Sequence, residues 1–378
     1  MEVYFDNSAT TKPYSEVIDS IADTMRKYYG NPSSAYCLGL EAELKMNESR
    51  DIIARTINCS RDEIVFTSGG SESNNFLVKG FVKPGKHIIT TKIEHPSLLN
   101  TCRALQKEGV KVTYLDVNNR GEINLEELAS SITKETQIVS IMHTNNEIGT
   151  VQQIESIGKY IKETNSRIKF HVDAVQAYGK YNIDVKKYNI DLLSISGHKI
   201  HGPRGIGIAY IRKGLVPVPL IYGGGQEKGF RSGTENLASI VGFGKAVEKI
   251  YENREKNFTK IHKLKNYFID KLSNIPKVRI NSQGNNYSPY VLSVSFIGIK
   301  GEVLLHMLEE KHIYVSTGSA CSARDNKESH VLKAIGLKKE ELDGTIRFSF
   351  AEDNSIEEVE YTLDVLDESL KFLRRVGK

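Results

Sequence analysis

Short runs rich in β-branched residues alternate with amphipathic stretches between residues 60 and 212, and this alternation constrains the fold more than any other feature. Strands separated by helical stretches form βαβ units, whose helices cover both faces of a parallel sheet. The predicted strands are 63–67, 87–91, 111–115, 137–142, 168–172, 191–195 and 207–211. Helical periodicity occurs between them, for example at 125–132 and 154–164. We therefore expect an α/β fold with a mostly parallel, seven-stranded sheet.

The rest of the chain predicts a second, smaller lobe. A charge-patterned stretch at 235–272 predicts a helix, straight or bent, that leaves the sheet. The elements predicted after it are strands at 290–296, 314–316 and 345–350 and helices at 302–310 and 356–372. This is an α+β pattern, and the first dozen residues could pack against either lobe. We expect a large domain over 15–255 and a small domain made of 1–14 and 256–378.

Composition excludes several classes of protein. Lys and Arg number 51 against 47 Asp and Glu, and this excess of +4 is small and spread along the chain, so it does not imply direct nucleic-acid binding. The four cysteines include no CxxC pair, so they form neither a disulfide framework nor a structural zinc site. The N-terminal residues are acidic where a signal peptide is basic, and the longest uncharged stretch, 280–299, contains Asn, Gln, Gly and Pro. We expect a cytoplasmic protein without a membrane segment or a metal site.

Polar side chains follow five of the predicted strands. They occur at 68–72, 94–95, 143–146, 173–176 and 196–199. The carboxyl ends of parallel strands meet at one edge of a sheet, where α/β proteins bind their ligands. Loops that only face water would more often carry Lys, Glu and Asp than the His, Asn and Gln found here. The pattern therefore predicts a ligand crevice at this edge.

Individual groups at these strand ends have more than one interpretation. Residues 68–71, Ser-Gly-Gly-Ser, open a helical stretch and form either a phosphate site or an ordinary N-cap. Asp173 could keep a ring nitrogen protonated with Gln176 on the same side, or either residue could cap a helix. His95 lies between a carboxylate and a hydroxyl and is an acid/base group, a stacking partner for a flat ligand, or a structural histidine.

Three further residues carry reactive groups. Lys199 lies in a glycine-rich turn between two apolar strands, beside His198, which suits an amine used for Schiff-base chemistry. Cys321 is flanked by small residues and followed by a charged run, which predicts a mobile, exposed loop with a reactive thiol. Arg347 alternates with apolar residues on a predicted strand and is either an edge charge or a fork for a carboxylate.

Taken together, the motifs resemble a known family, the class V aminotransferase-like, pyridoxal-phosphate-dependent cysteine desulfurases of the NifS/IscS type. The matching stretches are 4–11, 30–34, 66–75, 94–95, 142–149, 171–177, 196–199, 223–226, 231–236 and 319–322. Because they occur in order along nearly the whole chain, the match is specific. The resemblance implies a fold-type I large domain, a smaller α+β domain that carries the Cys321 loop, pyridoxal 5'-phosphate as cofactor, and a homodimer.

The resemblance also implies roles around the ring of the cofactor. Lys199 would form a Schiff base with it and then shuttle the substrate α-proton. Asp173 would pair with the pyridinium nitrogen, and Gln176 with the ring hydroxyl oxygen. His95 would stack on the ring and move protons.

Further roles concern the phosphate and the substrate. Gly70, Ser71, Ser196 and His198 would hold the phosphate, with Thr234 reaching in from a partner subunit. Asn146 would contact the ring or the substrate, and Arg347, with its help, would bind the substrate carboxylate. The thiolate of Cys321 would attack the sulfur of the bound cysteine, so that a persulfide forms on the enzyme and the remaining fragment is protonated to alanine.

The implied activity is conversion of L-cysteine to L-alanine, with the sulfur passed to an acceptor protein for iron–sulfur cluster assembly, tRNA thiolation or both. Selenocysteine lyase and aminotransferase are alternative activities on the same fold, although Cys321 argues against an aminotransferase, which needs no thiol. A non-catalytic sulfur carrier is a third reading, which the combination of lysine, aspartate and cysteine disfavours. Three positions depart from the common family pattern, Tyr36, Ala351 and Ser355, and none of them removes a proposed catalytic group.

Overall fold

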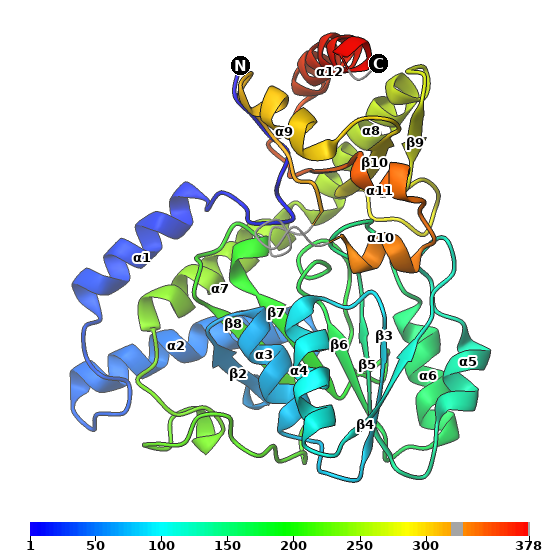
Figure 1. Ribbon diagram of the computed structural model, residues 1–378. Helices are drawn as coiled ribbons and strands as arrows, with labels where there is room; N and C mark the ends of the chain where they lie inside the picture. The colour runs from blue at the N-terminus through cyan, green and yellow to red at the C-terminus, as the bar shows by residue number, and fades with distance from the viewer. Residues whose placement is uncertain (319–327, 377–378) are drawn as a thin grey trace.

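The computed structural model describes residues 1–318 and 328–376, which form a large lobe around a central sheet and a smaller lobe next to it (Figure 1). The sheet of the large lobe contains β2 Ile64–Thr67, β3 His87–Thr91, β4 Lys111–Leu115, β5 Thr136–Met142, β6 Lys169–Asp173, β7 Leu192–Ser196 and β8 Gly207–Ile211. Each strand lies within one residue of its predicted bounds. The strand order is β2-β8-β7-β6-β5-β3-β4, and only β8 runs antiparallel to its neighbours. The expected mostly parallel, seven-stranded sheet is confirmed.

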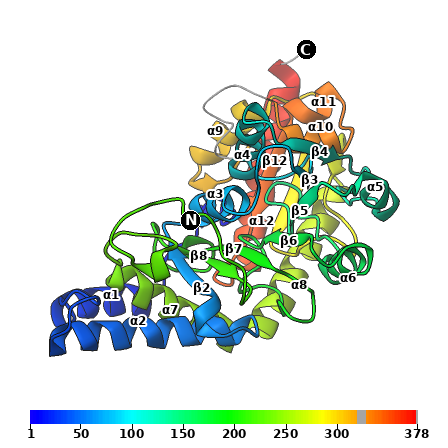
Figure 2. The same cartoon turned by 90° about the horizontal axis from the view of Figure 1, so that it is seen from below.

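Helices cover both faces of this sheet, as the view in Figure 2 shows. The helices of this lobe are α1 Ser15–Lys27, α2 Cys37–Thr56, α3 Gly70–Lys79, α4 Pro96–Lys107, α5 Leu125–Ser131, α6 Ile154–Thr164 and α7 Leu237–Glu252, with short 3-10 turns η1 Arg61–Glu63, η2 Gly197–Lys199 and η3 Glu227–Gly229. Of these, α1 packs against α7 and not against the sheet. Successive strand residues point to opposite faces, so each face has its own core. Ile64 and Phe66 belong to the core shared with α2, α6 and α7, whereas Val65 belongs to the core under α3 and α4.

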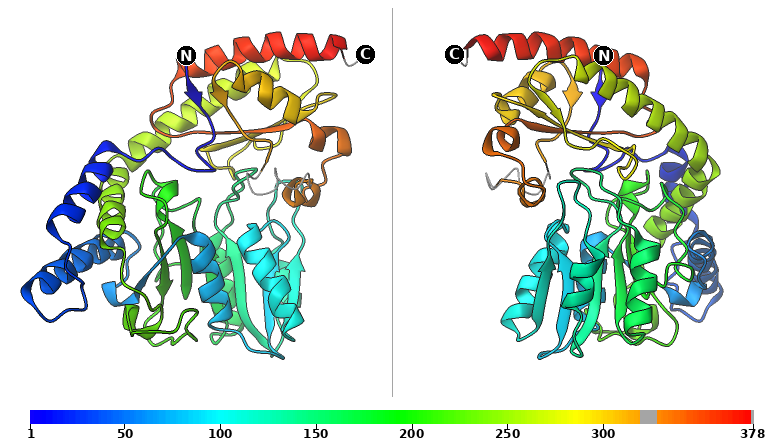
Figure 3. Two further views of the ribbon diagram at one scale, coloured as in Figure 1. Left: turned by 60° about the vertical axis from the view of Figure 1, so that its left-hand side comes forward. Right: turned by 90° about the vertical axis from the view of Figure 1, so that its right-hand side faces the viewer.

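The smaller lobe is built on a three-stranded antiparallel sheet in the order β12-β10-β9. Its strands are β9 Val278–Ile280, β10 Val291–Phe296 and β12 Thr345–Ser349, and a separate parallel pair joins β1 Val3–Tyr4 to β11 Ile313–Tyr314. The helices are α8 Arg254–Ser273, α9 Gly301–Glu309, α10 His330–Ala334, α11 Lys339–Asp343 and α12 Ile356–Val376. The two views in Figure 3 show this lobe above the upper ends of the large sheet.

The first residues of the chain connect the two lobes. Phe5 packs in the small-lobe core, with its ring centroid 5.2 Å from that of Phe350. A few residues later, the Thr11 backbone N–H donates to the carbonyl of His198 in the large lobe at 3.0 Å. The N-terminal segment therefore crosses between the lobes (Figure 3), which the sequence left open.

The predicted helix at 235–272 is two helices, α7 and α8, because Asn253 between them has φ −117° and ψ 11° and interrupts the helical backbone. Asparagine side chains favour such breaks because they compete with helical hydrogen bonds.

The domain boundaries near residues 14 and 255 stay a prediction. Within residues 1–318 and 328–376, none of the helices combines the length and apolar character needed to cross a lipid bilayer.

Candidate active site

A cavity of about 500 Å³ lies where the strand-end loops of the large sheet face the N-terminal segment and the small lobe. The predicted site residues that line it are Gly70, Ser71, His95, Asn146, Asp173, Gln176, Ser196, His198, Lys199 and Arg347. Thr234, which is exposed in the loop before α7, is not part of this lining in the described chain. Cys321 lies outside the described residues. The structure therefore brings together residues that come from five different strand ends and from β12.

The N-terminus of α3 forms one end of the cavity. Gly69, at φ 149°, precedes the helix, and a Cβ on Gly70 would lie only 2.6 Å from Cγ2 of Val175. Glycine therefore allows the backbone N–H groups of the helix end to lie against the cavity, and such groups bind anions. The polar side chains around this end are Ser71, Ser196, His198 and Arg204. Their chemistry fits a phosphate group.

Asp173 ends β6 and is buried in the floor of the cavity. Its Oδ1 accepts from the backbone N–H of Val175 at 3.0 Å, and its Oδ2 accepts from Nδ2 of Asn74 at 2.8 Å. Both carboxylate oxygens are therefore positioned by donors, and a carboxylate placed in this way can pair with the protonated nitrogen of a ring. Nearby, Gln176 donates through Nε2 to the carbonyl of Ser8 at 2.9 Å.

Lys199 closes the 3-10 turn η2 after β7 and lies half-buried at the cavity. Its Nζ donates to the carbonyl oxygens of Ser8 and Ala9 at 2.5 and 2.6 Å. The same N-terminal segment is fixed to the turn by Thr11, whose hydroxyl donates to the carbonyl of His198 at 3.0 Å. The amine is thus oriented by a segment from the opposite end of the chain.

Two histidines at the cavity are kept neutral by their surroundings. Burial, together with the nearby cations Lys199 and Arg204, lowers the pKa of His198 to about 4. Burial also lowers the pKa of His95, the N-cap residue of α4, while the charge of Asp173 opposes this. Nδ1 of His95 accepts from the backbone N–H of Ser97 at 3.1 Å. Neutral imidazole can stack on a flat ligand without the cost of burying a charge.

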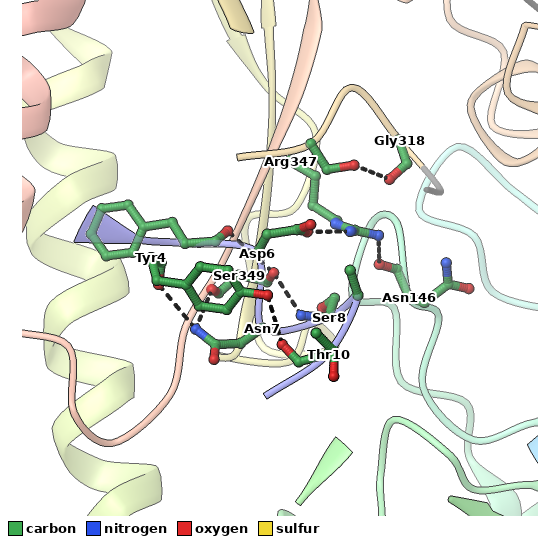
Figure 4. A network of polar contacts seen from close by, with 12 residues as sticks. Tyr4, Asp6, Asn7, Ser8, Thr10, Asn146, Gly318, Arg347 and Ser349 are labelled. Atoms are coloured by element: carbon green, nitrogen blue, oxygen red, sulfur yellow. Dashed lines mark hydrogen bonds and ion pairs between the residues drawn. The ribbon is translucent and has the colours of Figure 1, made fainter. Parts of the chain in front are cut away.

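Arg347 on β12 forms the opposite wall of the cavity, and Figure 4 shows its guanidinium between two partners. Nη2 donates to Oδ1 of Asp6 at 2.6 Å, and Nη1 donates to the carbonyl of Asn146 at 3.0 Å. Its Nε is buried and has no hydrogen-bond partner among the residues that the structure describes. Arg347 lies on the edge strand of its sheet, but only 2% of it is exposed, so its charge is not solvated, and its role as a fork for a substrate carboxylate stays a prediction.

Sequence reasoning missed several residues of the cavity. They are Ser8, Ala9, Thr10, Asn74, Ser97 and Arg204. Arg204 could have been found, because it lies in the glycine-rich turn that carries Lys199. Asp6, which pairs with Arg347, lies in the matching stretch 4–11, but nothing in the local pattern of that stretch shows which distant residues it contacts.

The residues present fit pyridoxal phosphate, the cofactor that the resemblance implied. The α3 end suits its phosphate, Asp173 suits its ring nitrogen, and Lys199 supplies the amine that reacts with an aldehyde. Oγ of Ser8, which belongs to a cavity-lining residue, is buried and without a partner in the described chain. A polar atom of this kind indicates that the cavity is built to contact a polar ligand.

Comparisons with known proteins agree with this chemistry. The sequence model of the family described as Aminotransferase class-V matches residues 3–362. A cysteine desulfurase IscS of Clostridium botulinum (strain Hall) is 44% identical over 100% of this chain and 96% of its own length. A solved structure of a NifS-like protein superimposes with a TM-score of 0.93 at 41% identity, covering 99% of this chain and 100% of that one. A structure of SspA in complex with cysteine gives a TM-score of 0.82 at 38% identity, covering 93% and 100%.

Proposed function

The chain belongs to the class-V aminotransferase family and is a pyridoxal-phosphate-dependent cysteine desulfurase, and we propose that it transfers the sulfur of L-cysteine to Cys321 and onward to an acceptor protein. The observation that carries the residue assignment is the shared cavity, in which Lys199, Asp173 and Arg347 face one space. An amine, a carboxylate and a buried guanidinium are what the cofactor aldehyde, its ring nitrogen and an amino-acid carboxylate require.

The residues that would hold the cofactor divide by the part they contact. The residues that would contact its phosphate are Gly70, Ser71, Ser196 and His198, together with Thr234 of a second subunit. The residues that would contact its ring are His95, Asn146, Asp173, Gln176 and Lys199. When bound, pyridoxal phosphate supplies an electron sink that stabilises negative charge on the substrate α-carbon. Nζ of Lys199 moves the α-proton, and the carbonyls of Ser8 and Ala9 orient that nitrogen.

Arg347 binds the substrate carboxylate, together with Asn146. The guanidinium is planar and buried, with Nη1 held by the Asn146 carbonyl and Nη2 held by Asp6. This pairing removes the rotational freedom of a long side chain before substrate binds, so less entropy is lost on binding. Substrate is thereby oriented with its α-carbon toward Lys199.

Cys321 accepts the sulfur. Its thiolate attacks the substrate sulfur, an S–S bond forms, the Cβ–S bond breaks, and the electron pair left on the carbon fragment is protonated to give alanine. The chain leading toward Cys321 supports this role, because the backbone of Ser316 pairs with that of Arg347, with N···O distances of 3.2 and 2.6 Å. Cys321 follows Gly318 by three positions in the sequence, a length of chain of about 11 Å at most.

Two further proposals concern partners. A homodimer is supported by the exposure of Thr234 and of an apolar run that precedes it, in which Val216 and Tyr222 are 75% and 76% exposed. Apolar side chains of this size are usually covered in a stable assembly. The sulfur acceptor that we propose is an iron–sulfur scaffold or a tRNA-thiolation enzyme in the cytoplasm. Light scattering on the purified protein tests the dimer, and a monomeric mass would contradict it.

Mass spectrometry after incubation with L-cysteine tests the sulfur transfer. We expect one added sulfur atom on Cys321 and alanine as product. Cys321→Ser should keep the cofactor absorbance and lose both the persulfide and sulfide release, whereas Cys37→Ser, which changes an exposed free cysteine, should behave like the wild type. Alanine production that persists in Cys321→Ser would point instead to a lyase that needs no enzyme thiol.

A further inference from the structure

A chain of hydrogen bonds joins Asp173 to His95 through Asn74 and Ser97. Nδ2 of Asn74 lies 2.8 Å from Oδ2 of Asp173 and 2.9 Å from Oγ of Ser97. Oγ of Ser97 in turn lies 2.8 Å from Nδ1 of His95. The chain links the group assigned to the ring nitrogen with the group assigned to the ring face. Asn74 and Ser97 have no role in the function proposed above.

The direction of these bonds follows from the chemistry of Asn74. A carboxylate can only accept, so the amide must turn its NH₂ group toward Asp173, and the second hydrogen of that group is donated to Ser97. The consequence is visible at the other end of the amide, where Oδ1 of Asn74 is buried without a hydrogen-bond partner in the part of the chain that the structure describes. An unpaired buried acceptor is destabilising. The fold tolerates it because both donors of the amide are used.

Ser97 determines the direction of the next hydrogen bond, the one to His95. Its oxygen accepts from Asn74, and its hydroxyl hydrogen is donated to Nδ1 of His95, because the backbone N–H of Ser97 already requires that nitrogen to be an acceptor. The backbone N–H of Ser97 donates to the same nitrogen at 3.1 Å. Two donors facing Nδ1 leave no place there for a proton, so the hydrogen of the neutral ring is on Nε2.

We infer that Asn74 and Ser97 are positioning residues that hold His95 with Nδ1 as acceptor and Nε2–H as the donor presented to the ligand, while the same Asn74 amide holds the carboxylate of Asp173. The inference rests on the proposed function in taking the ligand to be the cofactor with its substrate. In this arrangement His95 stacks and donates a hydrogen bond. Taking up the α-proton falls to Lys199 alone, because Nε2 of His95 already carries a proton, and a proton on Nδ1 would face the backbone N–H of Ser97 and require its hydroxyl to turn.

Nitrogen-15 NMR of the holoenzyme, labelled at histidine, reads the tautomer directly, with the His95 signals identified by their loss in His95→Gln. In the wild type we expect an unprotonated Nδ1 and a protonated Nε2 at neutral pH. Ser97→Ala removes the hydroxyl donor, so the proton affinity of Nδ1 should rise by up to about tenfold, and Ser97→Thr, which keeps a hydroxyl, should restore the wild-type titration. Asp173, Lys199 and His330, the charged and titratable groups that act on the ring, are the same in all three proteins.

Asn74→Leu should shift the titration in the same direction, because the Ser97 hydroxyl is then free to turn away from His95. Its matched control is Asn75→Ala, the neighbouring amide, which donates to the Ser71 carbonyl within α3 and should leave the His95 signals unchanged. Turnover in Ser97→Ala should fall by up to about tenfold.

A proton on Nδ1 in the wild type overturns the inference, as does a titration of Ser97→Ala identical to that of the wild type. Absence of a persulfide on Cys321 would instead overturn the proposed function and leave the His95 tautomer as inferred.

Discussion

The two sides of the cavity are built differently. On the large-sheet side, the end of a strand places each functional group, as Asp173 ends β6 and Lys199 follows β7, and more distant segments then add hydrogen bonds, as Ser8 and Ala9 do to Lys199. On the small-sheet side, Arg347 is held by Asp6 and Asn146, which lie 341 and 201 positions away in the sequence. The first arrangement follows from the topology of a parallel sheet. The second exists only once the two lobes are assembled.

The difference has a functional consequence. The large-sheet side carries the groups assigned to the cofactor, and the small-sheet side carries the group assigned to the substrate carboxylate and the chain that leads toward Cys321. Substitutions on the first side should therefore change cofactor binding, and those on the second side should change substrate binding while the cofactor stays in place. The following substitutions test this division.

Lys199→Ala should have the largest effect. Without the amine, the cofactor loses its covalent attachment and the α-proton loses its carrier, so turnover should fall by roughly a thousandfold or more. The visible absorbance band of the bound cofactor should disappear with it. Lys213→Ala, at an exposed lysine after β8, is the control and should keep both. Retention of turnover in Lys199→Ala would contradict the assignment of the large-sheet residues to the cofactor.

Arg347→Ala should raise KM by about a hundredfold, because a charge-assisted bond to the substrate carboxylate is lost. The absorbance of the bound cofactor should stay, which separates this side of the cavity from the other. Spectra and steady-state kinetics on the same preparation measure both quantities. Loss of the cofactor with an unchanged KM in the remaining holoenzyme would contradict the division.

His171 gives the large-sheet side a pH-dependent stability. Burial on β6 lowers its pKa to about 3, so the unfolded state, with an ordinary histidine pKa of about 6.5, takes up the proton first as pH falls. Neutral His171 therefore contributes its full stabilisation above the ordinary pKa, and this contribution is lost as the pH falls toward the pKa of the folded state. Between pH 7 and pH 5 the free energy of unfolding should fall by about 2 kcal/mol for this reason.

Denaturant titrations of wild type and His171→Gln at both pH values measure this loss. The difference in unfolding free energy between the two proteins should shrink as pH falls. His306→Gln, at a side chain 64% exposed on α9, is the control. The same behaviour in both variants would contradict the explanation.

Gly70→Ala should have the smallest effect. The added Cβ would meet Cγ2 of Val175 at 2.6 Å, so the α3 end must shift away from the phosphate and cofactor affinity should fall by about tenfold. Val175→Ala in the same protein removes the clash and should recover most of the affinity, as measured by cofactor release on dialysis. A double variant that binds the cofactor as weakly as Gly70→Ala would show that phosphate binding at the α3 end does not depend on this contact.

Much of the large-sheet side was predictable from the sequence. β-branched runs located all seven strands, and the polar groups after them located most of the cavity, because a strand end fixes where the next residues lie. Other features depend on contacts between distant segments. Neither the contact of the N-terminal segment with Lys199 nor the partners of Arg347 follow from local periodicity. The break at Asn253 escaped prediction because one asparagine in a charged helical pattern is a weak signal.

Reduction of the holoenzyme with borohydride tests the central claim most directly, since it converts a Schiff base between cofactor and protein into a stable bond whose position peptide mass spectrometry reads. We predict the phosphopyridoxyl group on Lys199. The informative competitor is Lys180, a buried lysine whose Nζ lies 3.3 Å from Oε1 of Gln176 and whose pKa burial lowers to about 8. Label on Lys180 or on any other lysine, with Lys199 unmodified, would contradict the account.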